Sequence, residues 1–545
     1  SDALPEIDLT TGLVWDSASS SWVKKDLSPY GNRNSWATAG FFGRINYDWK
    51  GRYLVEGNIR YDGTSRYRDN LRWNLYPSIS LGWNIANEDF WTPYRRYMDL
   101  WKLRASYGSL GNQNTNGWYP TYSTFAPSTN SGSWLQNGVK TTTIGVPAAI
   151  TTELTWEKVR SWNVGMDFGL FNNRLTGSFD YYTRYTIDMM GASLELPSIL
   201  GYTTPKTNNT DLMTYGWELE LEWKDQLSCG LFYGLKFLLS DSQTIVTKYP
   251  SNTTGSIRQY IPGRKLGEIW GYETIGIAKS QEEMDAHLDR LDQNFLEANG
   301  YYPSELRQGQ SALGSGWGAG DIMYKDLNGD GHISTGDDTI DNHGDLKVIG
   351  NSTPRYHFGI DLNLAWKGID FRMFFQGIMK RDYWQSSSYF WGANTEPEWS
   401  AALVQHLDFY RDENSKLVQD GIMDINTDAY YPRPSFDRGG EGNGSSGRNH
   451  QVQTRYLQNA AYIRLKNLQI GYTLPEKWTK PAKIERLRTY FSAENIWTGT
   501  SLASMFDPET IDGGNNNTEK DWRTYNNGNA YPLSIQLSFG ISITF

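Results

Sequence analysis

The last fifteen residues of the chain, YPLSIQLSFGISITF (531–545), alternate without interruption between large apolar side chains and small or polar ones. Because successive side chains of a β-strand point to opposite faces, this segment predicts a strand with one continuously apolar face. At about 3.3 Å per residue the apolar face is roughly 45 to 50 Å long, which suits a tilted strand that crosses a bilayer and its interfaces. The segment therefore favours a membrane β-barrel.

The composition of the whole chain agrees with this interpretation. Among the 545 residues there is no apolar run long enough for a transmembrane helix. The mean hydropathy of -0.61 does not argue against a barrel, whose lumen face and long loops are polar. Aromatic residues make up 14% of the chain and Gly occurs 54 times, which is typical of strands, tight turns and interfacial aromatic belts.

Several functional classes lack support in the sequence. A net charge of -10 without a basic stripe argues against nucleic-acid binding. Cys229 is the only cysteine, which excludes an internal disulfide, and we interpret it as an incidental thiol. The six His residues show no HExxH spacing, and neither a G-x-S-x-G elbow nor a P-loop is present. We therefore expect no enzyme, although a soluble all-β protein that binds or hydrolyses carbohydrate is the alternative.

Strand-like segments occur in pairs from residue 37 onward. Tight turns such as Lys50-Gly51, Asn172-Asn173 and Lys367-Gly368 alternate with loops that are much longer. Outer-membrane barrels have this asymmetry, with short periplasmic turns and long extracellular loops. The large loops lie near 110–153, 241–352 and 380–456. About thirteen strands are predicted, at 37–49, 52–62, 72–85, 99–109, 154–169, 174–185, 211–223, 230–240, 353–366, 369–379, 460–474, 486–498 and 531–545.

Two further details follow from the strand pattern. In 462–474 the apolar phase changes near Lys466-Asn467, which predicts a β-bulge at that point. If the last strand ends on the periplasmic side, the first one starts on the extracellular side. Residues 1–35 are then expected to form an extracellular, irregular segment.

Several motifs, in the same order, resemble the SusC/RagA family of TonB-dependent outer-membrane transporters over about residues 36 to 545. The resemblance rests on RINYDWKGRYLVEGNIRYDGTSRY, RWNLYPSISLGWNIANEDFW, KLRASYGSLGNQN, GDIMYKDLNGDGHI, YIRLKNLQIGYTLP and SFGISITF.

This resemblance implies an all-β fold, a transmembrane antiparallel barrel of about 22 strands that encloses a plug domain. It also implies an outer-membrane location in Bacteroidetes-type Gram-negative bacteria, with lipid and lipopolysaccharide around the barrel. The expected partners are a SusD-like surface lipoprotein and TonB, which energises uptake of oligosaccharides or oligopeptides. The sequence does not distinguish between these two substrate classes.

The chain matches only the C-terminal part of such a barrel, and the plug domain is not among its segments. An open sheet of about thirteen strands in lipid leaves two edges of unpaired backbone groups, each costing several kcal/mol. We therefore expect another polypeptide to supply the missing strands. The expected companion is the N-terminal part of the same transporter, with about nine strands and the plug.

The segment DLNGDGHISTGD (326–337) fits the D-x-[DN]-x-[DN]-G template of a calcium loop. Hard cations require several oxygen ligands from a short loop, and this spacing supplies them. A solvated turn is the alternative. The predicted ligands of a structural calcium ion are Asp326, Asn328, Asp330, His332 through its carbonyl, Ser334 and Asp337.

Aromatic residues crowd the loop after the strand at 369–379. Flat rings with polar neighbours can stack on sugars or hold peptide side chains. Packing of the loops on one another, or contact with a capping partner, is the alternative. The residues predicted to contact substrate are Tyr383, Trp384, Tyr389 and Trp391, with Phe390 and Trp399 in the same group.

Overall fold

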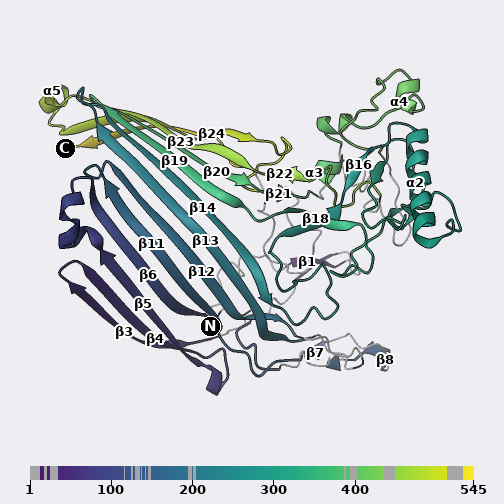
Figure 1. Cartoon of the computed structure of the whole chain (residues 1–545), viewed down its shortest axis with the longest axis horizontal. Coiled ribbons are helices and arrows are strands. Elements are labelled where there is room, and N and C mark those ends of the chain that lie inside the picture. The colour runs from purple at the N-terminus through teal and green to yellow at the C-terminus, as the bar shows by residue number, and fades with distance from the viewer. Residues whose placement is uncertain are drawn as a thin grey trace.

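The structure is a computed structural model of the chain (Figure 1). It describes residues 35–113, 149–193, 204–385, 402–434, 448–511 and 532–545, with shorter pieces at 13–16, 21–24, 115, 117–123, 127–128, 135–136, 138–141, 143–144, 199 and 388–392.

One antiparallel sheet of thirteen strands dominates the fold, and it curves into an open half-cylinder (Figure 1). The order across the sheet is β25-β24-β23-β20-β19-β14-β13-β12-β11-β6-β5-β4-β3, so consecutive strands of this sheet are neighbours. The predicted all-β meander is confirmed, and a soluble two-sheet sandwich is not what these strands form. The strands are β3 (Thr38–Trp49), β4 (Tyr53–Thr64), β5 (Trp73–Asn84), β6 (Met98–Asn112), β11 (Glu157–Leu170), β12 (Leu175–Ala192), β13 (Lys206–Gln226), β14 (Phe232–Lys248), β19 (Arg355–Trp366), β20 (Ile369–Lys380), β23 (Tyr462–Thr473), β24 (Arg486–Thr500) and β25 (Gln536–Thr544).

Residues with positive φ, in the left-handed backbone conformation, form the short turns at one end of the sheet. Lys50 and Gly51 have φ of 56° and 63°, and Lys367 and Gly368 have φ of 48° and 87°. Two-residue turns with positive φ match the twist of the flanking strands, which is why Gly follows Lys in both. The end of the sheet that carries these turns is called the short-turn end below.

The predicted bulge lies in β23 at Lys466. The register across β20 and β23 passes from Asn467 directly to Leu465, so Lys466 is the extra residue. The same residue is skipped on the other side, against β24. The bulge returns the apolar residues on both sides of Lys466 to one face of the sheet.

Strand lengths differ from the prediction at the long-loop end. β12, β13 and β14 extend beyond the predicted 185, 211 and 240 to Ala192, Lys206 and Lys248. These extensions carry polar residues on both faces, so the alternation that marks the membrane portion is absent there.

The last strand starts later than predicted, at Gln536 rather than Tyr531. Asn495 in the partner strand has φ of 55°, and its side-chain amide donates to the Ser534 carbonyl. The regular ladder of β24 with β25 therefore ends at the pair of Glu494 with Gln536.

A compact lobe covers the long-loop end of the sheet, at the right of Figure 1, and is called the cap. It is built from residues 249–352, 381–385, 388–392, 402–434 and 448–461. Its longest element is the helix α2 (Gln281–Asn299), whose N-cap Ser280 accepts a hydrogen bond from the Glu283 amide. Its small sheets pair β15 (Glu268–Tyr272) with β18 (Leu346–Asn351), β16 (Thr274–Ile277) with β17 (Ile322–Tyr324), and β21 (Asp382–Tyr383) with β22 (Gln458–Asn459).

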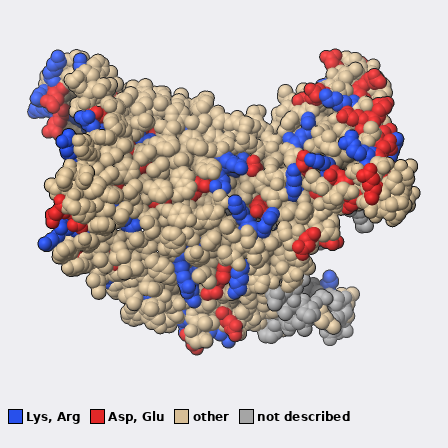
Figure 2. Space-filling model, viewed as in Figure 1, with Lys and Arg blue, Asp and Glu red and all other residues tan. Residues whose placement is uncertain are grey.

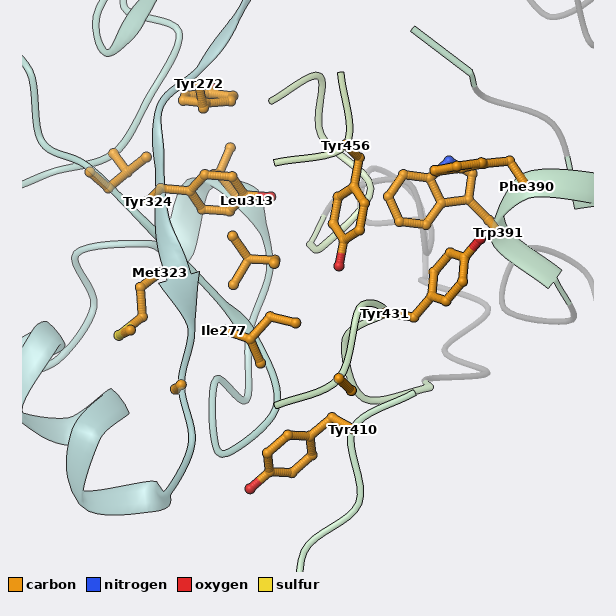
Figure 3. Close-up of a cluster of buried hydrophobic side chains, with 14 of the residues drawn as sticks. Tyr272, Ile277, Leu313, Met323, Tyr324, Phe390, Trp391, Tyr410, Tyr431 and Tyr456 are labelled. Carbon is orange, nitrogen blue, oxygen red and sulfur yellow. The ribbon is translucent and has the colours of Figure 1, made fainter. Parts of the chain in front are cut away.

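Buried aromatic side chains hold the cap together (Figure 3). Tyr324 and Tyr456 are fully buried, and Tyr456 lies against Trp391 with ring centroids 4.8 Å apart. Because these rings come from segments more than 60 residues apart, they fix the long loops as one packed unit.

The remaining elements are short. None of the helices in the described residues is long and apolar enough to cross a membrane. The remaining strands are β1 (Leu13–Asp16), β2 (Ser21–Lys24), β7 (Pro127–Ser128), β8 (Leu135–Gln136), β9 (Val139–Lys140) and β10 (Thr143–Ile144). The remaining helices are α3 (Ser388–Trp391), α4 (Lys416–Gln419), α5 (Glu476–Thr479), and the 3-10 turns η1 (Asp69–Leu71), η2 (Ile85–Asn87), η3 (Asp89–Tyr94), η5 (Ser311–Leu313), η7 (Val404–Leu407) and η8 (Lys480–Ala482).

Candidate functional site

The strand register gathers charged side chains on one face of the sheet, here called the lumen face. Arg104 of β6 donates to both carboxylate oxygens of Asp167 at 2.8 and 2.9 Å, and to both of Asp180 at 2.9 and 3.1 Å. Gly165 lies opposite Arg104, and a Cβ there would be 2.3 Å from an Asp180 oxygen. The close approach of these three charged groups therefore requires glycine at 165.

Further ion pairs continue across the lumen face of the other strands. Each joins residues of neighbouring strands or of strands two apart, and each leaves polar atoms accessible from the concave side. They are Arg44–Glu56 at 2.6 Å, Glu220–Lys236 at 2.5 Å, Asp361–Arg372 at 2.7 Å and Asp370–Arg488 at 2.5 Å. The lumen face can thus hydrogen-bond polar solutes, and in each of these four contacts the two charges are opposite.

The opposite face, here called the lipid face, is apolar and exposed. The odd-numbered residues of β25 from Leu537 to Ile543 are between 47% and 71% exposed. In β3 to β5, rings form a band at each end, with Phe41, Tyr61 and Trp73 at one and Trp49, Tyr53 and Trp83 at the other. Phe41 and Trp49 are eight residues apart in β3, or roughly 26 Å along the strand. With the strand tilt of about 40° in outer-membrane barrels this is roughly 20 Å of height, close to their apolar band of about 25 Å.

Most of the aromatic residues predicted to contact substrate lie inside the cap. Tyr383 and Trp391 are 4% and 2% exposed, and Phe390 is fully buried beside Trp391. These three side chains contact other loop residues, which favours the packing alternative, and substrate contact by them stays a prediction. A composition-based prediction cannot separate the two roles, because both use the same residue types.

Two residues of that group stay accessible, and one cannot be placed. Tyr389 is 53% exposed and Trp384 is partly buried against the cap core. Trp399 lies outside the described residues. Substrate contact by Tyr389 and Trp384 stays a prediction.

The predicted calcium loop forms a compact Asx-rich turn. Asp326 accepts hydrogen bonds from the Gly329 and Gly331 amides, and Asp330 accepts one from the His332 amide. Gly331 has φ of 76°, as the sharp turn at this position requires. A calcium loop and a solvated turn both use such hydrogen bonds, so calcium binding stays a prediction.

The residues at the predicted end of the calcium loop have hydrogen-bond partners of their own. The Asp337 carboxylate accepts from the Asn342 side chain, and the Ser334 hydroxyl accepts from the Gly336 amide. In the part of the chain that the structure describes, no three His, Cys, Asp or Glu side chains are grouped as metal ligands.

Asp345, which the sequence template does not include, lies against this turn. Its carboxylate is fully buried and accepts from the Leu327 and Ser334 amides. Burial, together with the negative charges of Asp326 and Asp330, raises the pKa of Asp345 to about 6, although those two amide hydrogen bonds act in the other direction. A cation at this turn would remove that repulsion.

Asp321 forms the most deeply buried ionic contact of the cap. Its carboxylate is 0% exposed and accepts at 2.9 Å from the guanidinium groups of Arg433 and Arg448. Asn449 and the Gly318 amide also donate to it at 2.9 Å. One carboxylate thereby joins segments that are more than 110 residues apart in the chain, and no local sequence signal marks it.

A second buried ionic cluster lies where the cap meets the lumen face. Arg464 is 4% exposed and contacts Asp507 and Glu509 at 2.7 Å, and Lys466 of the bulge contacts Glu509 at 2.8 Å. The bulge thus brings a second cation to the same carboxylate. The phase change in the sequence located the bulge but not its acidic partners, which lie about 43 residues further on.

Comparisons with known proteins agree with this architecture. The profile of the family described as "TonB dependent receptor-like, beta-barrel" matches residues 6–496. TonB-dependent receptor P3 of Formosa agariphila is 25% identical over 95% of this chain and 46% of its own length. TonB-dependent receptor SusC of Bacteroides thetaiotaomicron is 24% identical over 96% of this chain and 45% of its own length.

Among solved structures, that of the RagAB peptide transporter aligns with a TM-score of 0.66 at 21% identity, covering 94% of this chain and 48% of the other. This likeness concerns the fold. The chain spans about half the length of the relatives that it matches. With its apolar lipid face, its polar lumen face and a family match over most of its length, the chain belongs to the TonB-dependent receptor β-barrel family of the outer membrane.

Proposed function

We propose that this chain forms part of the wall and the extracellular cap of an active importer of oligosaccharides or oligopeptides. The single observation that carries the proposal is the lumen face, where paired charges line a concave surface directly below a packed cap. Such a surface gives polar solutes a series of hydrogen-bonding partners across the membrane. The names of the similar proteins are those of receptors and transporters, which supports a role in uptake rather than in catalysis.

The proposed partners follow from the same relatives. A SusD-like surface lipoprotein would close over the cap, and TonB would supply energy through a part of the transporter that this chain does not contain. The remaining barrel strands would pair with the edges at β3 and β25, whose backbone groups need partners in lipid.

Growth of a strain that lacks the full-length transporter tests the proposal. We expect loss of growth on either a defined oligopeptide mixture or an oligosaccharide mixture, restored by the wild-type gene and abolished again when TonB is removed. Uptake that continues without TonB would contradict active import and would indicate a passive pore. The mixture that fails to support growth identifies the substrate class.

We also propose that the turn beginning at Asp326 binds a structural calcium ion, with Asp345 as its closing ligand. The support is the buried Asp345 carboxylate next to Asp326 and Asp330. Calcium should raise the melting temperature of the wild-type full-length protein, and Asp345→Asn should remove this effect. The matched variant Asp337→Asn should keep it. The opposite pattern would restore Asp337 as the ligand.

A further inference from the structure

The connection between β5 and β6 places a group of aromatic rings on the lipid face at the short-turn end. Trp91 of η3 contacts Trp101 of β6, with ring centroids 4.6 Å apart. Trp101 lies in register with Phe168, among the apolar side chains of the lipid face. Phe90 and Tyr94 of the same connection are 59% and 55% exposed. Rings of this kind favour the boundary between hydrocarbon and headgroups.

Two arginines follow these rings directly. The Arg95 Nε donates to the Ala86 carbonyl at 2.7 Å, which holds the side chain while its terminal nitrogens remain available. The Arg96 guanidinium lies 4.5 Å from the centre of the Tyr97 ring. Both arginines are exposed, and among the described residues neither has a carboxylate within ion-pair distance. Two oriented cations beside an interfacial aromatic group are a suitable site for a phosphate anion.

The same arrangement of a cation over a lipid-face ring recurs at other short turns. Lys50 lies over Trp49 at 5.1 Å, and Lys367 lies over Trp366 at 4.7 Å. Trp49 and Trp366 are 44% and 42% exposed. Positive charge therefore follows the aromatic band along this end of the barrel rather than occurring at one connection alone.

The cap carries the opposite charge. Its segment 249–352 contains 16 Asp and Glu against 8 Lys and Arg. In Figure 2 most of the red atoms of the visible face gather on this lobe, at the right. By contrast, residues 476–486, which include α5, contain 4 Lys and Arg and 2 Asp and Glu. In the β5–β6 connection Glu88 and Asp89 both pair with Arg52, so Arg95 and Arg96 carry the positive charge that remains there.

We propose that the short-turn end binds the headgroups of anionic phospholipids, with Arg95 and Arg96 on the lipid phosphate and Phe90 and Tyr94 at the acyl boundary. The occupant is a membrane lipid because the cations lie beside rings that are themselves placed on the lipid face. The site is independent of the transported substrate and of any partner protein.

The test measures lipid binding to the delipidated full-length transporter by native mass spectrometry. The added probe is phosphatidylglycerol, or phosphatidylcholine with the same acyl chains. We expect the double variant R95Q/R96Q to bind phosphatidylglycerol about 25-fold more weakly, since each cation near an anionic surface contributes about fivefold. Binding of phosphatidylcholine should change little.

The matched control is Arg174→Gln at another short turn, where Arg174 already pairs with Asp225 at 3.4 Å. This variant should retain wild-type binding, and heat-modifiable migration on gels confirms that each variant is folded. The proposal is overturned if R95Q/R96Q binds phosphatidylglycerol like the wild type, if both lipids lose affinity equally, or if R174Q loses as much. Displacement of the lipid by millimolar inorganic phosphate would also overturn it, because the site would then recognise free phosphate.

Discussion

Replacing Asp321 by Asn removes one negative charge from the centre of the cap and keeps the size of the side chain. The carboxylate is 0% exposed and is the shared partner of Arg433 and Arg448. The Arg448 side chain is only 13% exposed, and its Nε is already buried without a hydrogen-bond partner among the described residues. The substitution would also take the negative counter-ion from the Nη2 atom of this guanidinium.

The expected cost follows from these exposures. Removing one partner of a buried ion pair costs about 3 to 5 kcal/mol, because the other charge stays buried and uncompensated. The Arg433 side chain is 42% exposed, so water can solvate its charge, and loss of its contact with Asp321 adds little to the cost of the substitution. The cap should therefore open about 10² to 4 × 10³ times more often, since 1.4 kcal/mol corresponds to a factor of ten.

Hydrogen exchange of the full-length protein, followed by mass spectrometry, reports this opening segment by segment. Peptides from β16, β17 and residues 448–456 should exchange faster in Asp321→Asn, while peptides from β11 to β13 should not change. The control is Asp428→Asn, which breaks a surface pair with Lys279 whose carboxylate side is 91% exposed. Unchanged exchange in the cap, or equal acceleration in cap and barrel, would refute the reasoning.

Three further predictions concern other parts of the chain. Leu537→Arg on the lipid face should lower the free energy of unfolding by about 2 to 4 kcal/mol and reduce the fraction of heat-modifiable barrel. Gln536→Arg on the lumen face, opposite Glu494, should leave that fraction unchanged. Equal losses in both variants would contradict the assignment of the two faces. Gly331→Ala should detach the loop from α2, because its Cβ would lie 2.3 Å from the Leu291 carbonyl oxygen. Gly329→Ala has the same backbone strain from a positive φ but meets no neighbouring atom, so proteolysis of the cap should be faster in Gly331→Ala than in Gly329→Ala. Burial lowers the pKa of His450 from 6.5 to about 4, so the folded cap holds it neutral and the opened cap protonates first as the pH falls. The free energy needed to open the cap should then fall by about 2 kcal/mol between pH 6.5 and 5. In His450→Phe, hydrogen exchange of the cap should depend less on pH.

The membrane portion of the fold could be predicted from the sequence because its signal is local. A period of two, tight turns with Gly and a single phase change at Lys466 are all contained within a few neighbouring residues. Each strand pairs with the next strand of the sheet, so the order of the strands also followed from the chain.

The cap could not be predicted in the same way, since its contacts join residues that are far apart in the chain. Asp321 and Arg448 are separated by 127 residues. Asp345 contacts the turn from a position beyond the end of the template that proposed Asp337. Aromatic composition indicated where rings concentrate, but burial of Trp391 depends on Tyr456, which belongs to another loop.

The pairing of charges on the lumen face also determines how far the electric field of the barrel wall reaches. An isolated charge projects a field that reaches across a wide pore, whereas two opposite charges less than 3 Å apart project that of a dipole, which decays far more steeply with distance. At Arg104, which contacts both Asp167 and Asp180, one negative charge is left over, so the field of the wall reaches further there than beside the simple pairs.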